Sequence, residues 1–305
     1  MKEFSALHAS DLTVGQAIQF CWERLNDSDV FYGHGTDNPW DEAVQLVLSV
    51  AQLPVDTDDS ALPHPVAALQ AEEIHALLTR RIDQHMPLPY LLGRAWFAGL
   101  EFSCDRRAII PRSPIAELIL RDYQPWYYGP PPQTILDLCC GGGCIGLAAA
   151  HHGQASVDLA DLDADSLALA KENRARLQLT DRVEIYQSDL FDELPEKRYD
   201  LILSNPPYVD SADLASMPAE YHHEPELSLG SGPDGLALTR RNLSQAANYL
   251  HEDGLLVVEV GNSWETLEQV YPLVPFTWLE FEHGGHGVFA LSAKELQEYS
   301  ASLCR

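Results

Sequence analysis

From Gln133 onwards, short apolar stretches alternate with longer amphipathic ones, and this alternation limits the fold more than any other feature of the chain. The short stretches are rich in Ile, Leu and Val, as buried strands are, and the longer ones have helical character. The expected strands are residues 134–138, 155–161, 183–187, 199–204, 255–260, 277–281 and 287–291. The expected helices are residues 143–151, 165–177, 236–250 and 264–270. Such alternation predicts an α/β fold with a mostly parallel, seven-stranded sheet and helices on both of its faces.

Residues 1–85 have a different pattern. Apolar residues recur at three- and four-residue steps in segments 12–25, 41–53 and 66–82, and no strand-like alternation appears. A stretch rich in Pro and Asp, residues 54–65, separates the last two segments. We expect a small helical domain over residues 1–85, which either covers the core or recognises the substrate.

Residues 86–132 are expected to connect this domain to the sheet. Aromatic and apolar residues surround Gly99 between Ala95 and Phe102, which predicts a β-hairpin. Gly129 and three prolines stiffen the end of the connector. The third region, residues 133–305, then holds the whole sheet.

The formal net charge is −27, with 7 Lys and Arg against 16 Asp and Glu up to residue 110 and 12 against 30 beyond it. Such a surface repels a phosphate backbone and attracts basic partners, although acidity also serves solubility alone. The N-terminus lacks the pattern of a secretory signal, and the most apolar stretch, Ala43–Val55, is too short to span a bilayer. We therefore expect a cytoplasmic protein whose six cysteines are reduced thiols.

A glycine-rich turn, Asp137 to Gly146, follows the first strand of the sheet and opens a helix. Gly141 and Gly143 permit tight backbone dihedrals and a close approach of a ligand. Asp161 ends the next strand, where a carboxylate can accept hydrogen bonds from ribose hydroxyls. This pattern alone fits NAD almost as well as S-adenosylmethionine.

Two acidic residues favour S-adenosylmethionine. The carboxylate of Asp137, just before the glycines, suits the cationic methionine end of that cofactor and offers nothing to a pyrophosphate. Asp189 closes the third strand, where it can accept the adenine amino group while Leu190 packs on the ring; alternatively, Asp189 caps a helix. No metal site is expected, because Cys139, Cys140 and Cys144 lack the paired spacing of zinc ligands.

The fourth strand runs into Asn205-Pro206-Pro207-Tyr208, at the edge of the sheet where ligands bind. The prolines have no N–H group, so the Asn205 side-chain oxygen and the Pro206 carbonyl are the outward groups, and both are acceptors. A planar –NH2 group has two donors and matches this pair. The turn predicts methylation of a planar nitrogen by positioning and electrostatics, with Tyr208 stacked on the target. Alternatively, the turn merely ends the strand.

Together these motifs resemble the protein-(glutamine-N5) methyltransferase family. The resemblance covers roughly residues 85–292 and includes segments 88–93, 97–102, 109–112, 224–230 and 232–236. It implies the class I, Rossmann-like methyltransferase fold, and substrate-amide binding by Asn205, Pro206, Pro207 and Tyr208. The cofactor-binding residues that it implies are Asp137, Cys140, Gly141, Gly143, Asp161, Asp189, Leu190 and Asn205.

Within that family, the connector distinguishes two branches. Release-factor enzymes typically carry Pro-Arg-Pro-Glu-Thr-Glu, whereas this chain has Pro111-Arg-Ser-Pro-Ile-Ala-Glu117 and ends its sheet with Gly285-His-Gly-Val-Phe289. Both segments resemble the branch that methylates ribosomal protein uL3. One departure is Cys139-Cys140, where relatives usually have Gly and a small residue. The alternatives are a release-factor substrate, an exocyclic base amine of nucleic acid, and an NAD-dependent oxidoreductase or binding module.

Overall fold

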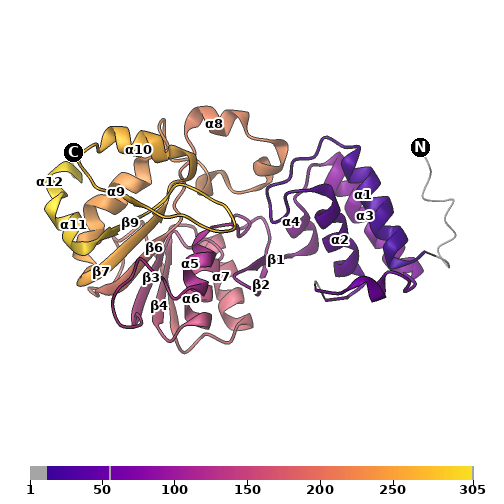
Figure 1. The fold of residues 1–305 in the computed structure, drawn as a ribbon, viewed down its shortest axis with the longest axis horizontal. Helices are drawn as coiled ribbons and strands as arrows, with labels where there is room; N and C mark the ends of the chain where they lie inside the picture. Colours follow the sequence, from indigo (N-terminus) through magenta and orange to yellow (C-terminus); the bar gives the residue numbers. More distant parts are fainter. Residues whose placement is uncertain (1–11, 55, 304–305) are drawn as a thin grey trace. The chain divides into compact units, whose positions relative to one another are not determined.

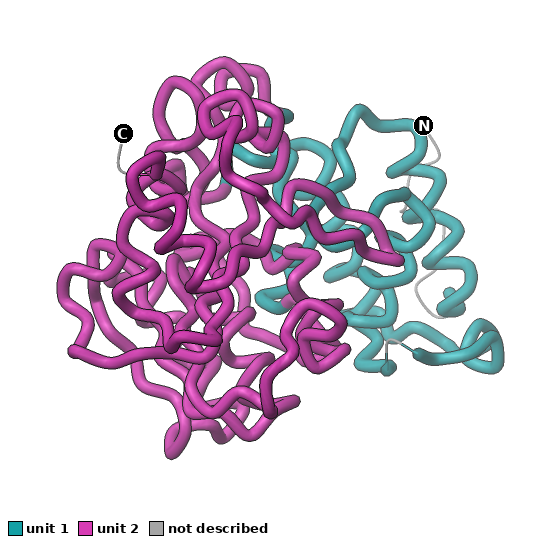
Figure 2. The backbone as a smooth tube through the Cα atoms, turned by 60° about the vertical axis from the view of Figure 1, so that its left-hand side comes forward, with its two compact units in different colours: residues 1–94, 218–223 teal, residues 95–217, 224–305 magenta. Residues whose placement is uncertain are grey.

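The computed structural model describes residues 12–54 and 56–303 (Figure 1). The chain forms two compact units, residues 1–94 with 218–223, and residues 95–217 with 224–305 (Figure 2). The boundaries expected after residues 85 and 132 fall inside the first and the second unit, respectively. No helix in the described ranges has the length and apolar character needed to cross a membrane.

The first unit is helical. Its helices are α1 (Val14–Asn26), α2 (Pro39–Val50), α3 (Ala68–Asp83) and α4 (Leu88–Leu92). Thr13 and Asn38 fix the starts of α1 and α2, because their side chains accept hydrogen bonds from backbone N–H groups of the first turn. The apolar faces of the helices pack into one buried cluster that includes Ile18, Leu46 and Ile74. The helical character of the N-terminal region is therefore as the periodicity predicted.

A buried charged cluster holds residues 218–223 in this helical unit. Arg81 donates from Nε to Glu42 Oε1 at 2.5 Å, from Nη1 to Glu220 Oε1 at 2.9 Å, and from Nη2 to the Phe31 carbonyl at 2.7 Å. Arg81 is 2% exposed, Glu42 4% and Glu220 1%. Since buried charges are tolerated only when they are paired, Glu220 is an integral part of the first unit.

A seven-stranded sheet forms the second unit, in the order β5-β4-β3-β6-β7-β9-β8. The strands are β3 (Thr134–Leu138), β4 (Ser156–Asp161), β5 (Val183–Gln187), β6 (Tyr199–Ser204), β7 (Leu250–Glu259), β8 (Thr277–Trp278) and β9 (Val288–Ser292). All neighbours pair in parallel except β9, which is antiparallel to both β7 and β8. This order and the single reversed strand confirm the predicted class I methyltransferase fold. The order of strands reverses between β3 and β6, where open α/β sheets bind ligands.

Helices cover both faces of the sheet (Figure 1). On one face lie α5 (Ile115–Leu120), α6 (Cys144–His152) and α7 (Ala164–Arg176), and on the other lie α9 (Ala237–Gln245), α10 (Trp264–Val270) and α11 (Ala293–Glu298). Side chains alternate between two buried clusters along each strand, as Ile135 and Leu136 do in β3. The smaller helices are α8 (Ser211–Ser216) and α12 (Ser300–Leu303), with 3₁₀ turns at Asp59–Ala61, Ala219–His223, Glu226–Ser228, Ala246–Asn248 and Gly261–Ser263.

The expected connector hairpin is present as β1 (Arg94–Phe97) and β2 (Leu100–Ser103). Ala98 and Gly99 join the strands with φ values of 48° and 77°, the positive dihedrals of a tight hairpin turn. Several details of the prediction are wrong. The strand expected over 277–281 covers only Thr277–Trp278, as β8. The helix expected over 236–250 ends at Gln245 and β7 begins at Leu250, five residues before the expected start. The connector also contains α4 and α5, which the sequence reading did not predict.

Candidate active site

Four parallel strands each have a polar residue at or just after the carboxyl end, and these residues lie along one edge of the sheet. Asp161 ends β4, Asp189 follows β5, Asn205 follows β6, and Glu259 ends β7. The turn after β3 lies between them, because β3 is flanked by β4 and β6. Four residues from distant parts of the sequence therefore gather around the glycine-rich turn.

The backbone of this turn explains its glycines. Gly141 and Gly143 have φ values of 52° and 82°, and Cys139 has a φ of 61°, in the region that favours glycine. A Cβ on Gly146 would stand 2.2 Å from Leu159, so the first turn of α6 packs directly on β4. Cys139 therefore adopts a backbone conformation that glycine reaches more easily.

Asp137 lies beneath the turn and is fully buried. Its Oδ2 accepts the Gly146 N–H at 2.7 Å, whereas Oδ1 has no hydrogen-bond partner among the described residues. Burial raises the pKa of Asp137 to about 7, and the proximity of Asp161 adds to the shift. An unpartnered buried oxygen of this kind suits a cationic donor.

Asp161 shapes the turn as well as facing the cavity. Its Oδ2 accepts the Gly141 N–H at 2.8 Å and its Oδ1 accepts the Asp163 N–H at 2.9 Å. Burial raises the pKa of Asp161, and these two backbone donors oppose the shift. Each carboxylate oxygen has a second lone pair, so both can still accept from a ligand.

Asp189 and Leu190 lie on the wall of the same cavity. Asp189 Oδ1 accepts from Arg241 Nη1 of α9 at 2.7 Å, and Leu190 is 4% exposed with a φ of 56°. No helix begins at Asp189 in the described part of the chain, since only a turn separates it from β6. The ion pair with Arg241 engages one carboxylate oxygen and was not predicted from the sequence.

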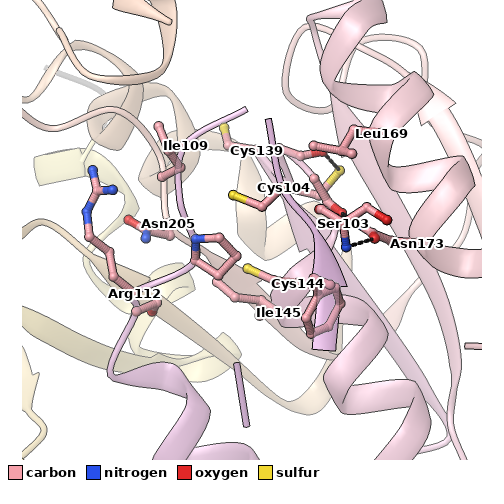
Figure 3. A pocket seen from close by; sticks show the side chains of 16 residues that line it. Ser103, Cys104, Ile109, Arg112, Cys139, Cys144, Ile145, Leu169, Asn173 and Asn205 are labelled. Atoms are coloured by element: carbon pink, nitrogen blue, oxygen red, sulfur yellow. Dashed lines mark hydrogen bonds between the residues drawn. The ribbon is translucent and has the colours of Figure 1, made fainter. Parts of the chain in front are cut away.

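Asn205 stands at the centre of the edge. It lines both of two adjoining cavities, together with Ile109, Cys139 and Gly141. Among the described residues, none shares a hydrogen bond with its side chain, and Figure 3 shows that side chain in the cavity wall near Arg112. Pro207 lines the larger cavity, and Pro206 is buried. The amide of Asn205 is thus accessible and uncommitted.

The two cavities differ in character. The one that Asp161, Asp189 and Leu190 line encloses about 620 Å³ when its open mouth is included. The other, about 510 Å³, lies between the connector and the turn. Buried Asn173 fixes the far wall of this second cavity, because its Nδ2 donates to the Gly142 and Ser103 carbonyls (Figure 3).

Four thiols line the second cavity, those of Cys104, Cys139, Cys140 and Cys144. Burial raises the pKa of each of them. Within the described residues, no group of three or more His, Cys, Asp or Glu side chains could hold a metal ion. Because a raised pKa keeps these thiols neutral, they line the cavity as small apolar groups.

The sequence did not predict a role for two carboxylates of this region. Glu224, 5% exposed, accepts from the Ile110 N–H at 2.9 Å and from both terminal nitrogens of Arg112 at 2.5 and 2.7 Å. Glu259, 6% exposed, accepts from Tyr208 Oη at 3.1 Å and from Ser113 Oγ at 2.6 Å. Glu259 had a usable signal, because an acidic residue that ends an apolar strand was the reason for selecting Asp161.

The cavities and their lining fit S-adenosylmethionine. The orphaned buried oxygen of Asp137 suits the cationic methionine end, and Asp161 and Leu190 provide acceptors and an apolar wall for the nucleoside. A glycine-rich turn with positive φ angles lets a ligand approach the backbone. Of the residues that the sequence assigned to the cofactor, Gly141, Asp161, Asp189, Leu190 and Asn205 line the larger cavity, whereas Asp137 and Gly143 line neither cavity.

Known proteins resemble the chain closely. Residues 127–220 match the methyltransferase small domain family. The ribosomal protein uL3 glutamine methyltransferase of Francisella tularensis is 45% identical over 289 residues, 94% of this chain and 92% of the relative. The protein of the same name from Xanthomonas campestris is 44% identical over 292 residues, 95% of this chain and 94% of the relative.

A methyltransferase from Pyrococcus furiosus is a more distant structural neighbour, with 15% identity, a TM-score of 0.45, and coverage of 64% of this chain and 89% of that one. The two relatives above carry the assignment, because their similarity extends over nearly the whole of both chains. The chain belongs to the protein-glutamine methyltransferases, in the branch named for ribosomal protein uL3.

Proposed function

We propose that this enzyme transfers a methyl group from S-adenosylmethionine to the side-chain amide nitrogen of a glutamine in ribosomal protein uL3. One observation carries the proposal: Asn205 lies in the wall of both cavities with an uncommitted amide. A residue so placed can contact a bound cofactor on one side and a target side chain on the other.

The chemistry required of the protein is positioning. An amide nitrogen is a poor nucleophile, because its lone pair is delocalised into the carbonyl. Asn205 Oδ1 and the Pro206 carbonyl accept the two N–H bonds of the target amide, which orients the nitrogen and stabilises the positive charge that develops on it. S-adenosylmethionine, when bound, supplies a methyl group activated by a sulfonium. The methylated nitrogen then releases its extra proton to solvent, so no strong base is needed.

The remaining residues have supporting roles. Asp137 faces the cationic end of the cofactor, Asp161 accepts from the ribose, and Asp189 with Leu190 binds the adenine. The backbone of Cys140, Gly141 and Gly143 forms the floor of the cofactor site. Tyr208 and Pro207 cover the target amide and exclude water.

The substrate is assigned from the names of the relatives and from charge. Both relatives at 44–45% identity are named for uL3. A chain with a net charge of −27 attracts a basic, RNA-binding protein and repels naked nucleic acid. The helical unit is proposed to recognise the substrate protein, since one glutamine in a pocket cannot provide such selectivity. The five cysteines of residues 12–54 and 56–303 are all free thiols, which suits the cytoplasm, where thiols stay reduced.

A direct transfer assay tests the proposal. The enzyme is incubated with methyl-labelled S-adenosylmethionine and, separately, with uL3, a peptide chain release factor and naked rRNA. Mass spectrometry then locates any added methyl group, and the Asn205→Ala variant controls for background labelling. We expect one methyl on a glutamine of uL3. Labelled release factor with unlabelled uL3 would move the chain to the other branch, and label in RNA alone would refute a protein substrate.

A further inference from the structure

We propose that Glu259 is a positioning residue for methyl transfer, and that it fixes the ring of Tyr208 against the target amide through the tyrosine hydroxyl. The inference rests on the proposed function in one respect, the placement of Tyr208 beside the target. It assigns to β7 a role in a site otherwise built from β3, β4, β5 and β6.

The hydrogen bonds of Glu259 form the first support. Its Oε1 accepts from Tyr208 Oη at 3.1 Å and its Oε2 accepts from Ser113 Oγ at 2.6 Å. Glu259 and Ser113 are 6% and 5% exposed, so these bonds are shielded from water. Hydrogen bonds to a carboxylate in such surroundings are stronger than those between neutral groups.

The packing around Tyr208 leaves the hydroxyl as the point where the ring is held. A Cβ on Gly261 would stand 2.5 Å from the ring, so the backbone just after β7 lies close against the ring. The Tyr208 carbonyl accepts from Ser263 Oγ at 2.8 Å, which fixes the main chain of the same residue. The bond to Glu259 adds a contact at the hydroxyl end of the ring, beside those of Gly261 with the ring and of Ser263 with the main chain.

Ser113 links this pair to the cavity. It lines the second cavity together with Arg112 and Asn205, and it belongs to the connector. The carboxylate of Glu259 therefore joins the wall of the cavity to Tyr208, at the end of the strand next to β6.

The same contacts argue against a role of Glu259 as a base. Both carboxylate oxygens accept hydrogen bonds from neutral hydroxyls, and no proton has to leave either hydroxyl for methyl transfer. Burial raises the pKa of Glu259, while its bonds to Ser113 and Tyr208 oppose the rise. In either protonation state the carboxyl group can hold the tyrosine.

Steady-state kinetics with uL3 as substrate test the inference. We expect Glu259→Ala to lower kcat by about 10- to 100-fold, the effect of losing a hydrogen bond to a charged group, with cofactor affinity within about twofold of the wild type. Glu259→Gln keeps an acceptor for Tyr208 and should retain kcat within about threefold. Tyr208→Phe combined with Glu259→Ala should lose no more than the worse single variant. Additive losses, or failure of the Gln variant equal to that of Ala, would overturn the inference.

Asp158 provides a matched control. It is 2% exposed and accepts from Tyr199 Oη at 2.8 Å, but Tyr199 begins β6, at the end of the strand opposite Asn205. Asp158→Ala thus perturbs a buried carboxylate–tyrosine pair away from the site and is matched to Glu259→Ala. It also removes an ion pair with Lys197 at 2.8 Å. We expect kcat of the folded Asp158→Ala variant to stay near that of the wild type. A loss of kcat equal to that of Glu259→Ala would show a general structural effect and refute positioning.

A second readout separates this inference from the proposed function. In protein with ¹³C-labelled tyrosine, the signal absent from Tyr208→Phe identifies Tyr208. We expect that signal to move or broaden in Glu259→Ala and to return in Glu259→Gln. The Tyr208 signal can respond to Glu259→Ala as expected while the wild-type enzyme methylates none of the candidate substrates. That combination would refute the proposed function but leave the pairing of Glu259 with Tyr208 in place. An unchanged Tyr208 signal and unchanged kcat in Glu259→Ala, with active wild type, would refute only the positioning role.

Discussion

At the scale of single residues, the catalytic role proposed for Asn205 leads to a direct prediction. Its side chain is uncommitted and lines both cavities. Replacing it with Ala removes one of two acceptors for the target amide, so we expect kcat to fall by about 10² or more, the cost of removing one electrostatic stabiliser. Cofactor affinity, measured by calorimetry, should change much less. A variant with near-normal turnover would contradict the proposed mechanism.

The role proposed for Asp137 predicts that cofactor binding depends on pH. Burial raises the pKa of this carboxyl from 3.8 to about 7 in the folded protein. The folded state therefore holds a proton that the unfolded chain releases at lower pH, and this contribution to stability is lost as pH rises from 3.8 through about 7. Binding of a cationic ligand requires the carboxylate, so the opposite trend applies to affinity.

We accordingly expect affinity for S-adenosylmethionine to weaken as pH falls below about 7, by up to about tenfold per pH unit. Calorimetry in two buffers with different ionisation enthalpies should detect proton release on binding at about pH 6. Asp137→Asn is the control, because it cannot titrate and should remove this dependence. A pH dependence that persists unchanged in the Asn variant would assign the titration to another group.

At the scale of elements, local pattern predicted the strands that touch the site. The bounds of β3, β5, β6 and α10 coincide with those expected, because the alternation of short strand-like and longer helical segments locates them. The start of β7 was wrong, since His251 to Gly254 reads as a polar turn. In the fold these residues belong to β7. The pairing of β6 with β7 begins at Tyr199 and Leu250, and its register shifts before Leu201.

The candidate site likewise contains residues that the sequence could predict and residues that it could not. Residues selected by their place after a strand, Asp161, Asp189 and Asn205, lie together at one edge, because parallel strands bring their carboxyl ends together. The partners of these residues were not predictable. Arg241 reaches Asp189 across 52 positions of sequence and Tyr208 reaches Glu259 across 51. Such pairs depend on tertiary packing, which has no local signature.

The contact between α6 and the sheet gives a prediction for stability. A Cβ on Gly146 would stand 2.2 Å from Leu159 and 2.8 Å from the Asp137 Cβ, so Gly146→Ala must push α6 away from β3 and β4. We expect the free energy of unfolding to fall by about 1–3 kcal/mol, the usual cost of overpacking, together with weaker cofactor binding. Denaturant unfolding and calorimetry measure the two effects.

Gly142→Ala is the matched comparison in the same turn. The nearest atom to its added Cβ is the end of the Leu169 side chain at 3.3 Å, which can move aside. This variant should lose less stability than Gly146→Ala. Equal losses would show that the turn tolerates no side chain anywhere, and that α6 packing is not the cause.

At the scale of the whole molecule, the net charge of −27 predicts a salt-dependent reaction. Charge attraction speeds the encounter with a basic protein and is screened as ionic strength rises, with a Debye length of about 8 Å at 0.15 M. We expect kcat/KM for intact uL3 to fall steeply with salt. The control substrate is a short neutral peptide that contains the target glutamine, for which kcat/KM should change little. Equal salt dependence of both substrates would contradict steering by charge.

The helical unit is not continuous in sequence, and this has a consequence during synthesis. Arg81 leaves the ribosome 139 residues before Glu220, which neutralises it. At about 5–20 residues per second, the nascent helices wait roughly 7–28 s for that carboxylate. Until then the guanidinium has only Glu42 as a buried acidic partner among the described residues. The helical unit, although translated first, is therefore completed late, after most of the strands that carry the site have been translated. A fragment that ends at residue 94 would lack the Glu220 carboxylate that pairs with Arg81.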